Sequence, residues 1–518
     1  MASARHLSLH GGRDVTPRIV ALRAALLAAL VGGLVAGPLQ AAIQAAAGAP
    51  AHGRKPNVII ILADDMGWGD TSYNGNKVVQ TPTLDQLARQ GIRFERFYAG
   101  SCVCAPTRAS LMTGQHGARM GISHWGSSHV EEGDILLSEI LKDLGYATGH
   151  FGKWHLGLLD KEGKSDFVAG PRTPEKNFSP PWLNGFDVCF STENVAPTWD
   201  PMKLPDGEHW GLPRRYESGL WGNNYWTEKG RMVPHDANLM GDDSRIIMDR
   251  VLPFVQTQVA KAVPFFAYIC FYAPHTPTIS GGKFLEMYQG HEGRHHFGAI
   301  TAMDTQIGRL CELLRDLGQE ENSLIWFCSD NGAMSHVDRF GLYGGYGSNL
   351  PFRGWKSSLY EGGIRVPSVL VYPALFRQPA VVPMACVTSD ILPTLAAILG
   401  IPDVRCGWPQ DGRNILPALR GEITERKKPI GFAHGQWSTW TTDQYKLLAN
   451  TGGGRTVCEL YDLSLDPYEQ NDLAPLYPER VRSMLRELSE WLQSCNRSCG
   501  QRYQHLPIPG SNMSGTEK

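Results

Sequence analysis

The stretch Asn57–Asp70 (NVIIILADDMGWGD) joins an unbroken apolar run to a polar cluster that begins with two adjacent aspartates. Three later segments repeat this design: Tyr146–Phe151 leads into Gly152–Gly157, Pro264–Tyr272 into Ala273–Pro277, and Leu324–Cys328 into Ser329–Gly332. Apolar runs of β-branched and aromatic residues are typical of strands that are buried on both faces. These segments therefore predict inner strands of one sheet, each followed by a polar loop.

Helical patterns lie between the apolar runs. Pro82–Gln90 has proline in its first turn, leucines on one face and Gly91 as its stop. Phe297–Leu317 repeats apolar residues at helical spacing and ends before Gly318. Strands that alternate with helices indicate an α/β fold, and such sheets place their functional sites where strands end in loops. Each polar cluster falls at such a strand end.

The pattern changes after about residue 425. Short pieces at Tyr445–Ala449 and Cys458–Leu463 predict strands, and apolar residues between Val481 and Leu492 share one face of a predicted helix. We therefore expect a small C-terminal α+β subdomain. The expected organisation is a signal peptide at residues 1–49, a large α/β domain at 54–425, the subdomain at 426–498 and a disordered tail at 499–518.

The composition limits the classes of partner. The chain has 518 residues, of which 49 are basic and 51 acidic, so its net charge is −2. This balance provides no extended field for nucleic acid or for a membrane surface, and neither is an expected partner unless the N-terminal segment is retained as an anchor. An anionic substrate would have to be held by a local cluster of charge.

The first fifty residues differ from the rest. Four arginines precede the uncharged apolar run Ala24–Gly37, and small residues follow at Ala47–Ala49. This layout is typical of a secretory signal peptide. The alternative is an uncleaved anchor, because Ala24–Ala49 carries no charge and nearly reaches the length of a membrane span. The short apolar run and Pro38 favour cleavage, and hence export to the periplasm or the medium, or to a lysosome-like compartment in a eukaryote.

Four oxygen donors follow two of the predicted strands. Asp64 and Asp65 come after the first strand, and Asp330 and Asn331 come after another. A single Asp-Asp pair is often only a loop or helix cap. Two such pairs at comparable strand ends favour a metal site, and hard oxygen donors suit Ca²⁺, with Mg²⁺ as the alternative, rather than zinc.

Two lysines and two histidines form a second candidate set. Lys153 and His155 follow a predicted strand, where neighbouring glycines let the backbone and a substrate approach closely. His275 lies between two prolines that stiffen its loop, and Lys356 lies in a glycine-flanked segment. A lysine near a histidine is usually a solvated surface pair. Beside a metal ion, however, these four side chains would hold a tetrahedral anion and carry protons.

Two thiols lie two residues apart in Cys102–Gly114 (CVCAPTRASLMTG). The sequence offers no convincing second pair of ligands for zinc, and a disulfide across Cys-Val-Cys would be badly strained. Cys104 instead precedes Pro106 at a predicted helix start, where unpaired N–H groups place positive potential beside the thiol. Arg108 lies one turn further along. This layout favours a chemical role for Cys104, whereas Cys102 is expected to be a packed thiol.

With these motifs the chain resembles the formylglycine-dependent (type I) sulfatases, which are arylsulfatase-like enzymes of the alkaline phosphatase superfamily. The family signature is Cys-x-Pro-x-Arg followed by an apolar pair and Thr-Gly, here Cys104–Gly114. Further motifs between about Asn57 and Leu473 are Asp64–Asp70, Gly152–Gly157, Ala273–His275, Ser329–Gly332, Tyr360–Pro367 and Leu460–Pro467. Thr107 replaces the commoner serine, and Cys102 stands where a small residue is usual. The resemblance implies a large mixed β-sheet sandwiched by helices, with the catalytic domain at residues 54–425.

The resemblance also implies a modified residue and a metal ion. A separate maturation enzyme would oxidise Cys104 to formylglycine, whose aldehyde hydrates to a geminal diol. The expected ligands of one Ca²⁺ ion are this diol and the side chains of Asp64, Asp65, Asp330 and Asn331.

The remaining candidates would act on the substrate and the diol. Arg108 would stabilise the diol, and Lys153 and Lys356 would grip the sulfate oxygens. One diol oxygen would attack sulfur while His275 protonates the departing alcohol. His155 would then take the proton of the second hydroxyl, so that sulfate is eliminated and the aldehyde returns.

The expected function is that of an exported sulfatase that hydrolyses carbohydrate or aryl sulfate monoesters. One alternative is a phosphodiester or phosphonate monoester hydrolase of the same superfamily, although the lysine and histidine set matches sulfatases better. Another is a non-catalytic glycan-binding relative, against which the intact Cys104 and both histidines argue. Five tryptophans would either pack in the core or form a platform for sugar rings: Trp182, Trp199, Trp210, Trp221 and Trp226.

Overall fold

The computed structural model describes residues 54–124, 129–162, 174–194, 196–203, 223–334, 346–401, 409–500 and 506–509. The predicted signal peptide at residues 1–49 lies outside these ranges, as does most of the predicted tail at residues 499–518. Within the described ranges, no helix is long and apolar enough to cross a membrane.

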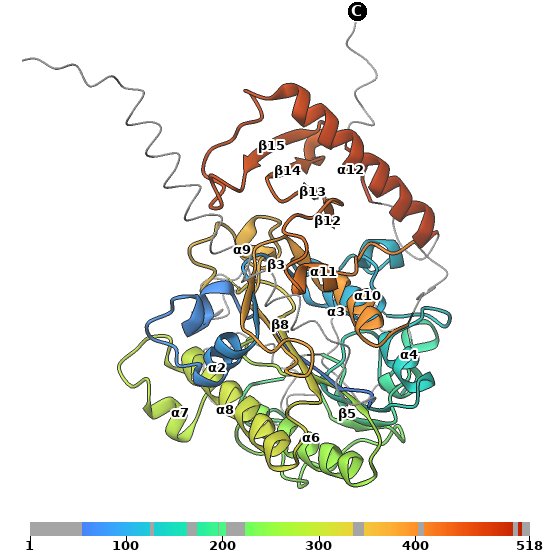
Figure 1. The fold of residues 1–518 in the computed structure, drawn as a ribbon, viewed down its shortest axis with the longest axis vertical. Helices are drawn as coiled ribbons and strands as arrows, with labels where there is room; N and C mark the ends of the chain where they lie inside the picture. The colour runs from blue at the N-terminus through green and yellow to red at the C-terminus, as the bar shows by residue number, and fades with distance from the viewer. Residues whose placement is uncertain are drawn as a thin grey trace, which may run out of the picture. The chain divides into compact units, whose positions relative to one another are not determined.

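A nine-stranded sheet forms the centre of the fold (Figure 1). In spatial order its strands are β10 (Ala380–Val382), β2 (Ile92–Phe94), β9 (Ser368–Val371), β8 (Ser323–Ser329), β1 (Asn57–Ala63), β7 (Phe265–Cys270), β4 (Ala147–Lys153), β5 (Val188–Thr192) and β6 (Trp226–Thr227). The inner strands β8, β1, β7, β4 and β5 are parallel, whereas β9 and β6 run antiparallel to their neighbours. The predicted large mixed sheet is confirmed.

Helices cover both faces of this sheet (Figure 1). One face packs against α3 (Cys104–Thr113), α4 (Leu137–Asp143) and α10 (Ile391–Ile398), and the other against α2 (Pro82–Gln90), α6 (Asp243–Ala260) and α8 (Arg294–Asp316). Successive residues of β1 explain its unbroken apolar run. Ile60 lies in the core of the first face, and Ile59 and Ile61 lie in the core of the second, so both faces are buried.

Shorter elements complete the main part of the fold. A two-stranded parallel sheet pairs β3 with β11, and four helices span a single turn or little more. Their bounds are β3 (Phe97–Tyr98), β11 (Cys386–Val387), α5 (Pro174–Asn177), α7 (Gly282–Glu286), α9 (Glu361–Ile364) and α11 (Leu416–Leu419).

A separate four-stranded antiparallel sheet lies in the C-terminal part of the chain (Figure 1). It consists of β12 (Ile430–His434), β13 (Trp437–Thr441), β14 (Tyr445–Asn450) and β15 (Val457–Asp462), and α12 (Pro478–Cys499) follows it. Leu488 and Trp491 of α12 pack with Trp440 and Leu447 of the sheet. The predicted small α+β element is confirmed, while its boundary at residue 425 stays a prediction.

Strand β4 extends further toward the C-terminus than the sequence indicated. The run predicted at Tyr146–Phe151 continues as β4 through Lys153, because Gly152 pairs with β7 and both residues pair with β5. Lys153 is therefore a strand residue, not a loop residue.

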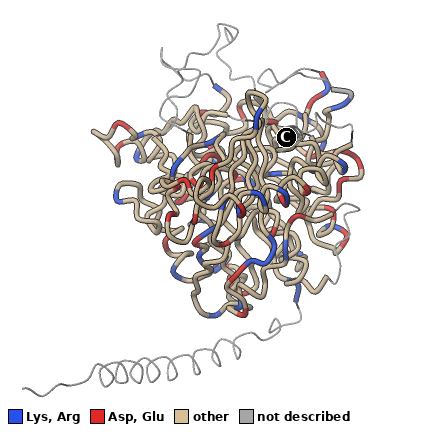
Figure 2. The backbone as a smooth tube through the Cα atoms, turned by 90° about the horizontal axis from the view of Figure 1, so that it is seen from above, with Lys and Arg blue, Asp and Glu red and all other residues tan. Residues whose placement is uncertain are grey.

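Lys and Arg residues are interspersed with Asp and Glu across the described chain (Figure 2), as expected from the net charge of −2.

Candidate active site

The two acidic pairs meet at one edge of the sheet. Strands β1 and β8 are parallel neighbours, and Ala63 is paired with Ser329, so the residues after each strand emerge side by side. The backbone N–H of Asp65 donates to Asp330 Oδ1 over 3.1 Å, and Asn331 Nδ2 donates to Asp65 Oδ1 over 2.6 Å. The sheet register thus brings together residues that are more than 260 positions apart.

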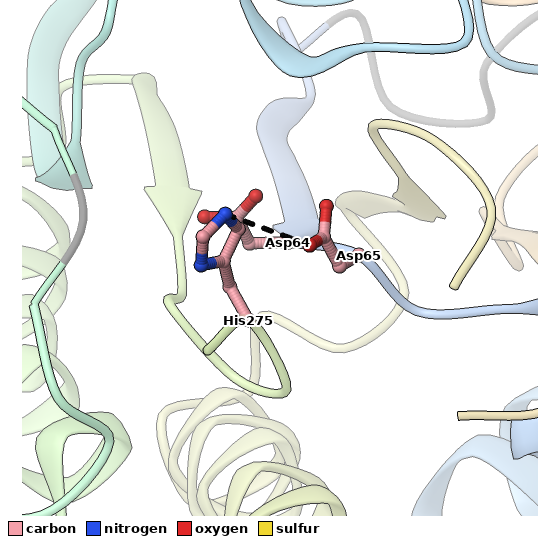
Figure 3. Close-up of side chains that lie close together, drawn as sticks. All are labelled: Asp64, Asp65 and His275. Carbon is pink, nitrogen blue, oxygen red and sulfur yellow. Dashed lines mark ion pairs between the residues drawn. The ribbon is translucent and has the colours of Figure 1, made fainter. Parts of the chain in front are cut away.

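Three more candidates lie at or just after the ends of strands β4 and β7. Lys153, the last residue of β4, places its Nζ 2.7 Å from Asp64 Oδ2, and both side chains are fully buried. His275 follows β7, and its Nε2 lies 3.5 Å from Asp65 Oδ2 (Figure 3). His155 follows Lys153 in the left-handed backbone region, at φ 56°, and its backbone N–H donates to the carbonyl of Glu193.

Lys356 reaches this edge from the loop after β8. Its Nζ lies 2.6 Å from Asp65 Oδ1. The backbone N–H of Lys356 donates to the carbonyl of Ala333, close to the acidic pair, and the next N–H, of Ser357, donates to the carbonyl of Cys102. The loop is thus bonded both to the segment of Asp330 and to the segment that precedes Cys104.

Helix α3 supplies the cysteine and the arginine. Cys104 is its first residue, and every residue of the helix is buried. Arg108 donates from Nε and Nη2 to Asp330 Oδ2 over 3.1 and 2.8 Å, and from Nη1 to the carbonyl of Lys153 over 2.9 Å. Its Nη2 also lies 3.8 Å from Asp64 Oδ1. The arginine therefore ties the helix of Cys104 to both acidic pairs.

Burial and neighbouring charges shift the pKa values of Asp64 and Asp330 in opposite directions. Burial alone would raise the pKa of Asp64, but Lys153, His275, Arg108 and Lys356 hold it well below its usual range. Burial, reinforced by the charge of Asp64, raises the pKa of Asp330. Neighbouring buried carboxyls behave in this way because they resist ionising together.

The same surroundings act on the histidine and the thiol. Burial lowers the pKa of His275 to about 4, so its imidazole is neutral at pH 7 in the absence of a ligand. Burial raises the pKa of the Cys104 thiol even though Lys153 and Lys356 oppose this shift. Because a thiolate is the reactive form of cysteine, Cys104 as a plain thiol is poorly suited to be a nucleophile here.

The side chains present fit a hard metal ion. Asp64 Oδ1 and Asn331 Oδ1 are buried, and no donor among the described residues makes a hydrogen bond to either atom. One ligand atom each of Asp64, Asp65 and His275 lies within 4.8 Å of the others. Carboxylate and amide oxygens are the donors that Ca²⁺ or Mg²⁺ prefers. His275 is close enough to join this group, which the sequence did not suggest.

Two arginines near Lys356 in the sequence, and the tryptophans considered for a sugar platform, make other contacts. Arg353 stacks over Tyr360, and Arg365 donates to the carbonyl of Glu95, so neither arginine that flanks Lys356 joins the cluster. Trp226 lies in the core and Trp182 packs against it, which favours core packing over a sugar platform for these two. The ring of Trp199 lies against Gly281, where a Cβ would be 2.5 Å from it, and Trp210 and Trp221 lie outside the described residues.

The sequence did not identify the residues that hold the loop of Lys356. Glu361, Lys446 and Glu469 are fully buried and make contacts with one another within 3.0 Å. Glu361 falls inside one of the motifs and Glu469 lies two residues after another, so a signal was present. Their joint arrangement had no local pattern, because Lys446 lies 85 positions from Glu361.

Comparisons with known proteins agree with this geometry. A sulfatase family model matches residues 56–401. The N-acetylgalactosamine-6-sulfatase of Mus musculus is 31% identical over 419 residues, which cover 77% of this chain and 72% of that protein. The N-acetylgalactosamine-6-O-sulfatase of Bacteroides thetaiotaomicron is 30% identical over 494 residues, 85% and 93% of the two chains.

A solved structure shows the same fold over nearly the whole chain. The crystal structure of Ps i-CgsB in complex with k-i-k-neocarrahexaose has a TM-score of 0.72 and 26% identity, and the match covers 87% of this chain and 95% of that one. The family match spans every candidate site residue, from Asp64 to Lys356. This chain therefore belongs to the sulfatase family and is a sulfuric ester hydrolase.

Proposed function

We propose that the chain hydrolyses sulfate monoesters of saccharides through a formylglycine made from Cys104, with one bound Ca²⁺ ion. The observation that carries this proposal is the convergence of Cys104, Arg108 and two lysines on a buried acidic cluster at one edge of the sheet. A protonated, buried thiol is a poor nucleophile, which supports a modified residue at this position. The hydrated aldehyde would supply two hydroxyl groups, one for attack on sulfur and one for the later release of sulfate.

The acidic residues would hold the cation. Asp64, Asp65, Asp330 and Asn331 offer the oxygen donors, and two of these oxygens have no hydrogen-bond partner within the described part of the chain. A divalent cation there would neutralise the clustered carboxylates and stabilise negative charge on the reacting oxygens. The two lysines now paired with Asp64 and Asp65 would then be available to the sulfate.

The side chains around the cluster would divide the work on the substrate. Lys153 and Lys356 would bind the sulfate oxygens and orient the sulfur, and Arg108 would stabilise the hydrated residue 104. His275 would donate a proton to the oxygen of the departing alcohol. A bound sulfate ester places negative charge beside its ring, which favours the protonated form that this step requires. His155 would accept the proton of the remaining hydroxyl, so that the sulfate leaves.

The relatives support a saccharide substrate. Two of them are named as N-acetylgalactosamine 6-sulfatases, and the solved structure is a complex with k-i-k-neocarrahexaose. The test is release of inorganic sulfate from sulfated monosaccharides, including 6-sulfated N-acetylgalactosamine, beside an aryl sulfate and an aryl phosphate. We expect sulfate release from a saccharide and from the aryl sulfate, with little phosphate release. Faster hydrolysis of the phosphate would contradict the proposal and favour a phosphohydrolase.

Export and maturation belong to the same proposal. The arginine-rich start and the apolar run Ala24–Gly37 support a cleaved signal peptide. We propose an exported, periplasmic or secreted protein that needs a separate formylglycine-generating enzyme. Cell fractionation followed by N-terminal mass analysis tests the first point, and activity with and without that enzyme tests the second. A full-length, cell-retained protein would contradict cleavage and export.

A further inference from the structure

Lys356 lies in a loop, residues 353–362, whose two ends are hydrogen-bonded to each other. The backbone N–H of Gly362 donates to the carbonyl of Arg353 over 2.7 Å, which brings the two ends of the loop together. Leu359 is buried in a cluster that also contains Val103, the neighbour of Cys104, and Phe432 and Leu448 of the C-terminal sheet. The C-terminal sheet therefore packs directly beneath this loop and beside the segment that leads to Cys104.

Glu469, which follows β15, contacts both ends of this loop. Its carboxylate accepts a hydrogen bond from the backbone N–H of Glu361 over 2.6 Å, and its backbone carbonyl accepts one from Arg353 Nη1 over 3.0 Å. Glu469 is fully buried and has a left-handed backbone, with φ 57°. A non-glycine residue held in this region indicates that the surrounding contacts determine its conformation.

Lys446 of β14 places a positive charge beside the carboxylates of Glu361 and Glu469. Its Nζ lies 3.0 Å from Glu361 Oε1 and 2.9 Å from Glu469 Oε1, and all three side chains have no exposed surface. The Tyr98 hydroxyl also donates to the carboxylate of Glu361, and Arg365 Nη1 lies 3.4 Å from Glu361 Oε2. Two carboxylates this close together stay charged in a buried place only with cations beside them.

We propose that Lys446 and Glu469 are positioning residues, which act through Glu361 to hold the Lys356 loop at the distance from Cys104 that sulfate transfer requires. This inference rests on the role proposed above for Lys356. It assigns part of the catalytic arrangement to the C-terminal sheet, although neither positioning residue contacts the acidic cluster. A misplacement of about 1 Å in a catalytic group can cost about 100-fold in rate.

The test is a double-mutant cycle of Lys446→Met and Lys356→Ala, with aryl sulfate kinetics normalised to the formylglycine content of each preparation. Lys446→Met alone should lower kcat/KM by about 10- to 100-fold. In the Lys356→Ala background the same change should cost no more than about twofold, because there is no longer a lysine to misplace. A purely structural role would give the same loss in both backgrounds.

Two further variants separate positioning from stability. The double variant Lys446→Met/Glu469→Gln loses one positive and one negative charge together. Its melting temperature should therefore be closer to that of the parent than the melting temperature of Lys446→Met is, while its kcat/KM stays low. Arg426→Met is the matched control, because Arg426 forms a buried ion pair with Asp390 at 2.6 Å in the same part of the chain without touching the loop. The control should lose stability and keep kcat/KM within about twofold of the parent.

The outcomes distinguish this inference from the proposed function. If Lys356→Ala leaves kcat/KM unchanged, the role assigned to Lys356 is wrong and the positioning proposal falls with it. If Lys356→Ala is impaired but Lys446→Met costs the same factor in both backgrounds, only the positioning proposal is overturned. Full activity of the Lys446→Met/Glu469→Gln variant, or an equal loss in Arg426→Met, would also overturn it.

Discussion

Replacing Asp330 with asparagine preserves the shape of the side chain and removes its negative charge. Asp330 Oδ2 accepts both the Nε and the Nη2 hydrogen bonds of Arg108, and neither side chain is exposed. The next carboxylate oxygen, Asp64 Oδ1, lies 3.8 Å from Nη2. The substitution therefore leaves the buried guanidinium with one longer ion pair and takes one of three carboxylates from the metal cluster.

The size of both effects follows from these contacts. Removing one partner of a buried ion pair typically costs about 3–5 kcal/mol, because the other charge stays buried. Asp64 still compensates part of the Arg108 charge, and burial and Asp64 also disfavour the charge of Asp330 itself. We therefore expect the unfolding free energy of the metal-free protein to fall by no more than about 3 kcal/mol. Two unit charges about 4 Å apart interact by about 4 kcal/mol at an effective dielectric constant of about 20. Loss of a carboxylate should therefore weaken Ca²⁺ binding by at least about 100-fold.

Calorimetric Ca²⁺ titration and denaturant unfolding of the metal-free protein measure the two effects separately. The matched control is Asp390→Asn, because Asp390 holds the buried Arg426 with hydrogen bonds of 2.6 and 2.9 Å away from the acidic cluster. It should lose at least as much stability as Asp330→Asn and retain Ca²⁺ affinity and aryl sulfate turnover. The metal assignment is wrong if Asp330→Asn binds Ca²⁺ within about twofold of the parent, or if the control loses as much affinity.

His275→Ala should lower sugar sulfate turnover by about 10²–10⁴-fold and aryl sulfate turnover much less, because only the poor leaving group needs the proton. Equal losses in steady-state kinetics would show that His275 is not the acid. His155→Ala should instead let sulfated protein accumulate at residue 104 with either ester, as intact mass spectrometry would detect; without an adduct, His155 has another role. Asp411→Asn should lower the unfolding free energy at pH 7 by about 2 kcal/mol. Burial alone would raise the pKa of Asp411, but Arg119, whose Nη2 lies 2.7 Å from Asp411 Oδ1, lowers this pKa from 3.8 to about 2. A lowered pKa stabilises above the unfolded value, so this difference should be complete above about pH 4 and vanish as the pH falls to about 2; a difference that persists there would contradict the ion pair.

Much of the fold could be predicted because its strands are buried on both faces. The apolar run Asn57–Ala63 coincides with β1 and ends before the first aspartate, and the predicted helix Pro82–Gln90 coincides with α2. The order of the strands was not predictable, because it depends on pairing between distant segments. The antiparallel insertion of β9 between β8 and β2 has no signal within Ser368–Val371 itself.

The sequence predicted those parts of the candidate site whose residues lie at strand ends. Asp65 and Asp330 meet because their strands are parallel neighbours, and polar residues at strand ends already indicated such a meeting. The position of His275 beside Asp65 depends on the path of a loop, which apolar periodicity does not encode. The support from Lys446 was missed because a lone lysine in a short strand looks like a solvated side chain until the buried carboxylates around it are known.

Peptide mass spectrometry of residue 104 tests the central claim most directly. The protein would be produced with and without a formylglycine-generating enzyme, and the aryl sulfate turnover of each preparation would be compared with the fraction of Cys104 that has lost its sulfur. We predict that turnover rises in proportion to the formylglycine fraction and is nearly absent from the unmodified protein. Full turnover by a preparation that contains only cysteine at residue 104 would contradict it.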